Sequence, residues 1–168
     1  MSSSRLELAI GQIRFAREYT QSLLADLEPS DWFAQPTEGV SHVAWQVGHL
    51  AMAQYGLCLF RMRGRADVDL ELMSSAFRKK FSKGTTPDPD PTKNPSPEDI
   101  CGVFNRVYEQ VMLELPEFSD TVLNEPVDLP YAAFATKFGG LLFCSHHEIL
   151  HAGQIGLLRR LLGKATIR

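Results

Sequence analysis

Residues 39–60 read GVSHVAWQVGHLAMAQYGLCLF and contain no Asp, Glu, Lys or Arg over 22 positions. The run is long enough to cross a bilayer. However, polar side chains are spread through it, among them His42 and His49, and such side chains are costly in hydrocarbon. A helix that is apolar almost all round is typical of the most buried element of a helical domain. We therefore predict a buried helix from about Ser41 to Arg63, with Ser41 as its N-cap.

Three further segments show the apolar spacing of amphipathic helices, at about residues 6–27, 97–115 and 138–162. The segment that starts at Pro97 has Ser96 as its expected cap and acidic residues in its first turn. No segment alternates as a strand. Four long helical patterns joined by long connections predict an all-α fold, a four-helix bundle.

The chain of 168 residues suits one domain, 1–168, with one hydrophobic core. A proline-rich loop at about 84–97 holds five prolines between Pro87 and Pro97, a density that removes backbone donors and prevents regular structure. We expect this segment to be a loop or a crossover connection.

Charge and cysteine content exclude several classes of protein. Seventeen Lys and Arg against 20 Asp and Glu leave a net charge of −3, so nucleic acid is not expected as a partner. Three cysteines, Cys58, Cys101 and Cys144, form no CxxC pair, which indicates neither a disulfide framework nor a zinc ribbon. The N-terminus lacks an uninterrupted apolar stretch. We therefore expect a cytoplasmic protein with no membrane partner.

The candidate metal ligands are histidines. His147 and His151 are four residues apart, so on a helix they differ by roughly 40° and point the same way. His146 is rotated by roughly 100° and should leave that face. His49 lies in the middle of the most apolar helix. Buried neutral imidazoles need hydrogen-bond or metal partners to offset their desolvation, and a shared ion would serve all three.

Three imidazoles around one divalent ion per chain leave a coordination position open for water or substrate, as in catalytic sites. Such an ion acts as a Lewis acid. Zinc, nickel and iron all accept three nitrogens, so the ligand type does not select the metal. Because a proton competes for the same lone pair, we expect metal affinity to fall below about pH 6.

Several neighbouring residues have two candidate roles each. Gln154 either orients a ligand or bound water, or makes a packing hydrogen bond; Trp45 either walls the pocket or packs in the core. Cys144 is either a fourth ligand or a small buried hydrophobe, which is the commoner role of a free cysteine. We expect Glu148 to face solvent, and Arg17 to lie on the polar face of the first helix.

The run His147-Glu-Ile-Leu-His151-Ala-Gly153-Gln154-Ile155 resembles the HxxxHxGQ signature of the DinB-like (DinB/YfiT-like) superfamily of metal-dependent proteins. Val47-Gly48-His49-Leu50 resembles the companion histidine of that family. The resemblance implies an up-up-down-down bundle with long crossover connections, commonly a homodimer, with His49, His147 and His151 as metal ligands. It also implies relatives that are transferases and isomerases using low-molecular-weight thiols.

We therefore expect a metal-dependent enzyme, a hydrolase or a thiol transferase, acting on a small-molecule substrate. A non-catalytic metal-binding or small-ligand-binding stress-response protein is the competing expectation. A third is that the histidines are structural and bind no metal.

Overall fold

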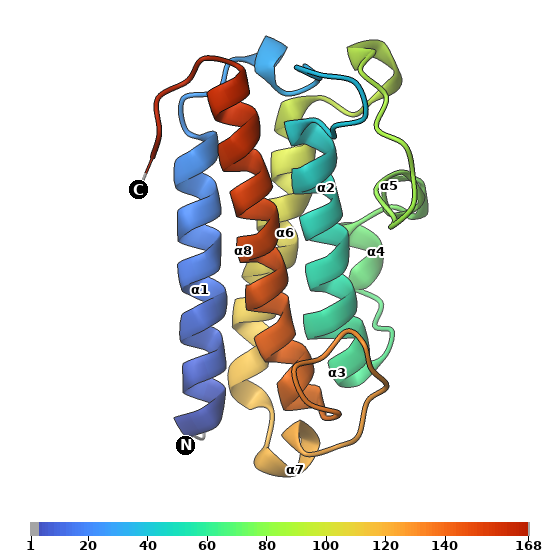
Figure 1. Ribbon diagram of the computed structural model, residues 1–168. Coiled ribbons are helices and arrows are strands. Elements are labelled where there is room, and N and C mark those ends of the chain that lie inside the picture. The colour runs from blue at the N-terminus through green and yellow to red at the C-terminus, as the bar shows by residue number, and fades with distance from the viewer. Residues whose placement is uncertain (1–3, 168) are drawn as a thin grey trace.

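The computed structural model describes residues 4–167, and every regular element in that range is a helix (Figure 1). Within it, the sole strand-like pairing is an isolated bridge between Pro126 and Thr136. The fold is all-α, as predicted. The long elements are α1 (Ser4–Leu24), α2 (Val43–Gln54), α6 (Pro97–Glu114) and α8 (Lys137–Leu161). The short ones are η1 (Pro29–Asp31), η2 (Tyr55–Phe60), α3 (Arg61–Arg63), α4 (Asp69–Leu72), α5 (Ser75–Lys80), η3 (Pro91–Lys93), η4 (Leu115–Glu117) and α7 (Asp120–Leu123).

The long helices lie side by side, and contacts along them fix their directions (Figure 1). Arg17 of α1 contacts Glu148 of α8, and one and a half turns further on the Leu23 carbonyl accepts a hydrogen bond from Arg159. From the first contact to the second, the residue numbers increase along both helices, so α1 and α8 are parallel. Figure 1 shows α2 and α6 running in the opposite direction.

In chain order the helices therefore run up, down, down, up, which corrects the expected up-up-down-down order. The reason lies in the connections. Residues 25–42 stay at the end of the molecule where α1 stops, so α2 must start there and run back (Figure 1). Residues 64–96 then travel along the side of the helices, with α4 and α5 in them, and return the chain to the end where α6 begins.

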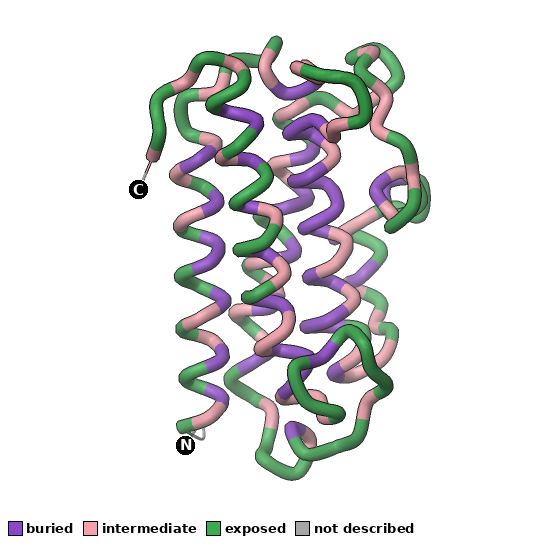
Figure 2. Tube along the Cα trace, viewed as in Figure 1, coloured by how far each residue is buried: buried purple, intermediate pink, exposed green. Residues whose placement is uncertain are grey.

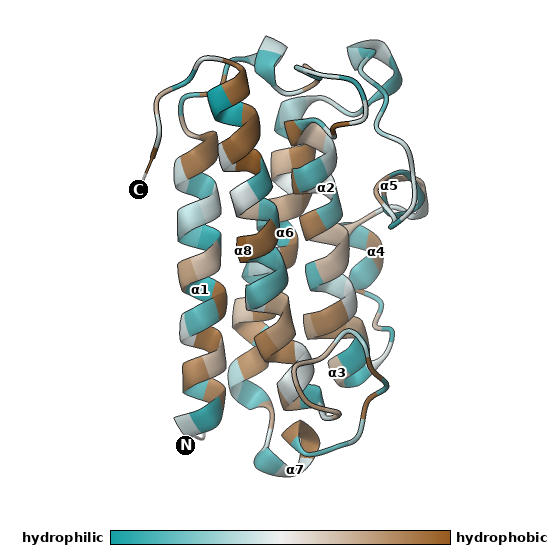
Figure 3. Cartoon of the chain, in the orientation of Figure 1, coloured by the Kyte–Doolittle hydropathy of each residue, from teal (hydrophilic) through white to brown (hydrophobic). Residues whose placement is uncertain are grey.

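The helix predicted at about 41–63 is the centre of the core. Nine of the twelve residues of α2 are buried, and Figure 2 shows the buried positions of α1 and α2 on the sides that face the other helices. Hydrophobic and hydrophilic positions recur in turn after turn along α1, as its amphipathic spacing predicts (Figure 3). Among the described residues, no helix combines the length and the hydropathy that a membrane crossing requires.

The N-terminus of α2 corrects one expectation and shows a structural histidine. His42, not Ser41, is the cap: its Nδ1 accepts the Trp45 N–H at 3.0 Å. Because Nδ1 is an acceptor, Nε2 carries the proton and donates to the Asp88 carbonyl of the proline-rich loop at 3.0 Å. The predicted cap of α6 is confirmed, since Ser96 Oγ accepts the Asp99 N–H.

The helix that begins at Val43 continues to Arg63 but contains a π-turn, η2, that the sequence pattern does not indicate. In η2 the Arg61 N–H donates to the carbonyl of Gly56, five residues earlier. Gly64 then ends the helix with φ +80°, a conformation that costs glycine least. A π-turn holds one more residue than an α-turn, so it rotates every side chain that follows it.

A buried polar cluster joins α1, α2, α6 and α8. Arg17 is 1 % and Glu148 2 % exposed, and Arg17 Nε donates to Glu148 Oε1 at 2.9 Å. Arg17 also donates to Gln54 Oε1 and to the Phe104 carbonyl, and its guanidinium lies 3.4 Å from the centre of the Phe104 ring. The expected solvent exposure of Arg17 and Glu148 is therefore wrong: each charge is neutralised by a partner more than a hundred residues away.

Candidate metal centre

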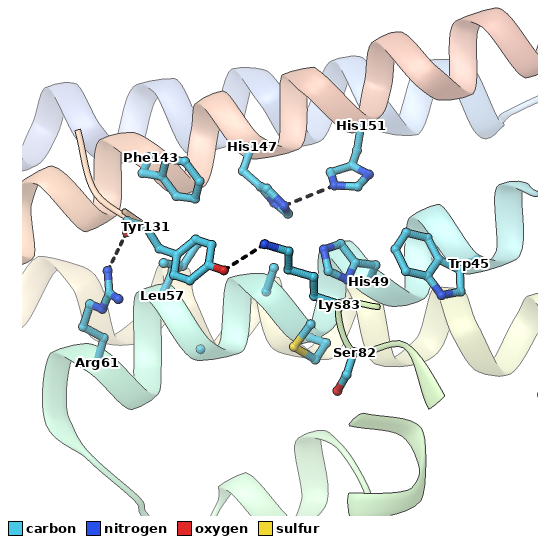
Figure 4. Close-up of a pocket in the computed structure, with 13 residues that line it drawn as sticks. Trp45, His49, Leu57, Arg61, Ser82, Lys83, Tyr131, Phe143, His147 and His151 are labelled. Atoms are coloured by element: carbon cyan, nitrogen blue, oxygen red, sulfur yellow. Dashed lines mark hydrogen bonds between the residues drawn. The ribbon is translucent and has the colours of Figure 1, made fainter. Parts of the chain in front are cut away.

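Three histidines from two antiparallel helices meet in one place. His49 comes from α2, and His147 and His151 come from successive turns of α8 (Figure 4). One ligand atom of each lies within 4.8 Å of the others. Within residues 4–167 this is the single group of three or more His, Cys, Asp or Glu side chains placed to share an ion. The structure thus brings together the residues that the sequence predicted.

His49 is oriented by the segment that follows α5. Its Nδ1 lies 2.8 Å from the carbonyl of Phe81, so Nδ1 carries the proton and donates, which leaves the Nε2 lone pair free. The Trp45 ring stacks on the imidazole at 4.7 Å and 7°, and Trp45 Nε1 donates to Thr85. Gly48 permits this packing, because a Cβ there would lie 2.5 Å from the Phe81 ring.

His151 is oriented by the amide of Gln46, which is buried on α2. The Nδ1–H of His151 donates to Gln46 Oε1, so its Nε2 is also an unprotonated acceptor. That atom lies 3.1 Å from Nε2 of His147. Two imidazole nitrogens at this separation can share a proton or a cation, and borderline divalent ions prefer such nitrogen donors. The three side chains therefore fit a divalent metal, with His49, His147 and His151 as the residues that would hold it.

Burial also keeps these imidazoles neutral. Loss of hydration lowers the pKa of His147 to about 4 and that of His151 to about 3, and repulsion from neighbouring histidines adds to both shifts. Burial lowers the pKa of His49 as well. Neutral imidazole is the form that binds metal. Competition from protons therefore begins at a lower pH than the value near 6 expected from an unperturbed histidine.

A cavity of about 700 Å³ opens beside the histidines. Its walls are mainly apolar, and it contains two cationic side chains, a serine and a tyrosine but no carboxylate. The lining residues are Trp45, His49, Met52, Ala53, Gly56, Leu57, Arg61, Ser82, Lys83, Tyr131, Phe143, His147 and His151 (Figure 4). A ligand in this cavity has direct access to the point on which the three imidazoles converge.

The other predicted site residues divide into two groups. Trp45 lines the cavity, whereas Gln154 is exposed and lines a separate hollow next to Gln46. Cys144 is buried and outside the histidine group, and His146 is exposed, as its position on the helix predicted. Sequence reasoning missed Gln46. The sequence does contain a signal for Gln46, because this residue precedes His49 by about one turn of the same helix.

The comparisons with known proteins agree with this architecture. The profile of the DinB superfamily matches residues 12–155, which include all three histidines. No curated protein and no solved structure matches the chain. The family profile covers most of the sequence, and the chain belongs to the DinB superfamily.

Proposed function

We propose that the protein is a metal-dependent enzyme, a transferase or hydrolase, that binds one divalent ion per chain through His49, His147 and His151. The observation that carries this proposal is the convergence of three neutral imidazoles at the side of a cavity of about 700 Å³. A structural metal site is closed by four protein ligands, whereas three ligands beside a cavity leave room for a substrate. When bound, zinc, nickel or iron would supply Lewis acidity at that position.

The residues around the histidines favour a thiol over water as the nucleophile. No carboxylate lines the cavity, so a carboxylate general base is absent from its wall. A thiol, with a pKa near 8.5, loses its proton far more readily than water does. We therefore place transfer to or from a low-molecular-weight thiol ahead of hydrolysis. The three cysteines of the chain itself are free thiols, which is consistent with a reducing compartment such as the cytoplasm.

The absence of a carboxylate base from the cavity wall also supports a second candidate function. In this second candidate, the protein binds a metal and a small ligand without turnover. The two candidates differ in one test. Protein purified without chelator is reloaded with zinc, nickel, iron or manganese and assayed with thiols plus epoxide or aryl halide electrophiles, and separately with esters. The enzyme predicts turnover that chelation abolishes and metal restores, and that His147→Ala removes while His146→Ala does not. Binding of less than a tenth of an equivalent of every metal would contradict both candidates.

We also propose that the protein is a homodimer formed through α8. Leu150 and Leu157 are 65 % and 47 % exposed on one face of this helix, and the exposed Leu161 extends the same face. Twofold symmetric dimers are the commonest way to cover such a surface. Sedimentation should show a dimer that Leu157→Glu converts to a monomer. The control is Leu70→Glu, which changes an equally apolar, 85 % exposed side chain on α4 and should leave the dimer intact.

A further inference from the structure

Two cations in the wall of the metal cavity have no acidic partner. Arg61 is half-buried at the end of the long helix, and Lys83 lies in the segment that also supplies the Phe81 carbonyl. No carboxylate among residues 4–167 lies within ion-pair distance of either side chain. Other inward-lying arginines are paired with acids: Arg17 with Glu148, Arg63 with Asp69 and Glu114, and Arg159 with Asp26.

The backbone is specifically arranged to bring Arg61 into the cavity. In a regular α-helix, Arg61 would be rotated from His49 by roughly 120°, because twelve residues exceed three full turns by that angle. The additional residue of the π-turn η2 removes about 100° of this offset, so Arg61 comes to the face of His49. π-turns of this kind occur frequently at functional sites.

The opposite wall leaves space for the guanidinium. Gly140, near the start of α8, is buried, and a Cβ at this position would lie 3.3 Å from Nη1 of Arg61. This separation is tighter than ordinary van der Waals contact. The small residue on α8 and the π-turn on the facing helix therefore act together to hold Arg61 in the cavity.

Both cations are bonded to one residue through neutral oxygens. Arg61 Nη1 donates to the Tyr131 carbonyl at 2.5 Å, and Lys83 Nζ donates to the Tyr131 hydroxyl at 3.1 Å (Figure 4). Tyr131 belongs to the irregular segment before α8. Neutral oxygens are weaker partners for a cation than an anionic oxygen is. The two side chains thus keep unused capacity to bind an anion at the same cavity as the histidines.

We infer that Arg61 and Lys83 form an anion-binding subsite, so that the cavity takes a small molecule in which an apolar body carries a carboxylate, phosphate or phosphonate. The apolar body would lie against Met52, Leu57 and Phe143. The whole chain has a net charge of −3, so a general attraction of the protein for anions does not account for this preference. That the bound molecule is a substrate rests on the proposed function, whereas the anion subsite itself does not.

The test uses metal-free protein and a matched pair of probes, 3-phenylpropionate and 3-phenylpropan-1-ol, titrated by calorimetry. The carboxylate should bind at least about tenfold more tightly, because hydrogen bonds to charged groups are worth more than those to neutral ones. Arg61→Gln and Lys83→Gln should each remove most of that difference without changing the affinity for the alcohol. The controls, Arg14→Gln and Lys79→Gln, remove exposed cations elsewhere and should change neither affinity.

A carboxylate that binds no more tightly than the alcohol, or that does not bind, would overturn the inference, as would equal effects of the cavity and control variants. Lys83 is exposed, so Lys83→Gln does not endanger folding and gives an independent result. Because no metal is present, a protein that failed to bind metal would refute the proposed function and leave this result unaffected. A protein that bound metal but not the carboxylate would refute only the subsite.

Discussion

The same helix, α8, contributes to two polar clusters that differ in how their hydrogen bonds are satisfied. In the Arg17–Glu148 cluster, a buried cation meets a buried anion, and Gln54 and the Phe104 carbonyl accept further hydrogen bonds. In the histidine cluster, adjacent on the helix, two imidazole nitrogens lie 3.1 Å apart at the side of an open cavity, and no charged side chain within residues 4–167 pairs with them. The first cluster pairs its two charges within the protein and leaves only Gln54 Nε2 without a hydrogen-bond partner among the described residues, so we interpret it as structural. The second places three neutral imidazoles close together beside a cavity, an arrangement that suits a divalent cation.

The largest effect that would test this contrast is on folding. Glu148→Ala should lower the free energy of unfolding by about 3–5 kcal/mol, because it leaves Arg17 charged and buried without its anion. His147→Ala in metal-free protein should cost about 1 kcal/mol or less, as for a partly exposed side chain. Urea unfolding measures both. The double variant Arg17→Met, Glu148→Leu should recover most of the lost stability; if it remained as unstable as Glu148→Ala, the explanation by an unpaired charge would be wrong.

The second effect is on metal affinity. His49→Ala, His147→Ala and His151→Ala should each weaken binding by more than about 100-fold, since even changes to residues that only orient a ligand cost 10- to 100-fold. His146→Ala should have no effect. His42→Ala should cost about 1 kcal/mol of stability through loss of the α2 cap and leave metal affinity unchanged. Competition with a chromophoric chelator measures these affinities, and equal losses in all five variants would show that the metal lies elsewhere.

A smaller effect separates the two buried glutamines of α2. Gln46→Leu should weaken metal binding about 10- to 100-fold, because its amide oxygen fixes the ring and the tautomer of His151. Gln54→Leu removes an acceptor from the other cluster and should lower stability without changing metal affinity. Gln46→Glu retains an acceptor and should restore much of the binding. A loss of metal affinity in Gln54→Leu as large as in Gln46→Leu would remove the distinction between the clusters.

The last test is a pH dependence. In the unfolded chain the histidines have a pKa near 6.5, whereas burial lowers the pKa of His147 to about 4 and of His151 to about 3. Between these values the unfolded state binds more protons, so the stability of metal-free protein should fall as the pH drops from about 6.5 to 4. Because burial lowers the pKa of all three histidines, metal affinity should begin to fall at a lower pH than the value near 6.5 of free histidine, and should fall steeply near pH 4.

The matched control is the double variant His147→Gln, His151→Gln. Denaturant unfolding should show that the stability of this variant depends less on pH. An unchanged profile would assign the acid sensitivity to other groups, such as His42, whose pKa burial also lowers.

Local sequence patterns are sufficient to predict the helical class and the cluster of His49, His147 and His151. Helical spacing places His147 and His151 on one face whatever surrounds them, and a charge-free run around His49 is compatible with few environments other than a core. Periodicity also places Arg17 at a position equivalent to Ile13 and Thr20, but its charge favours the interpretation that it faces solvent. A charged residue can occupy a core position when its counter-ion is present, and that counter-ion, Glu148, lies 131 residues away.

The direction of the helices, the partners of the buried charges and the surroundings of the histidines depend instead on packing between segments far apart in the sequence. Helical periodicity shows which residues share a face, but it does not show which face of another helix they meet. The π-turn η2 is an example, because its additional residue rotates Arg61 by about 100° about the helix axis and so brings it to the cavity. An apolar helix of regular composition carries no pattern that marks such a turn. Packing against α8, with Gly140 opposite, is what makes that position available.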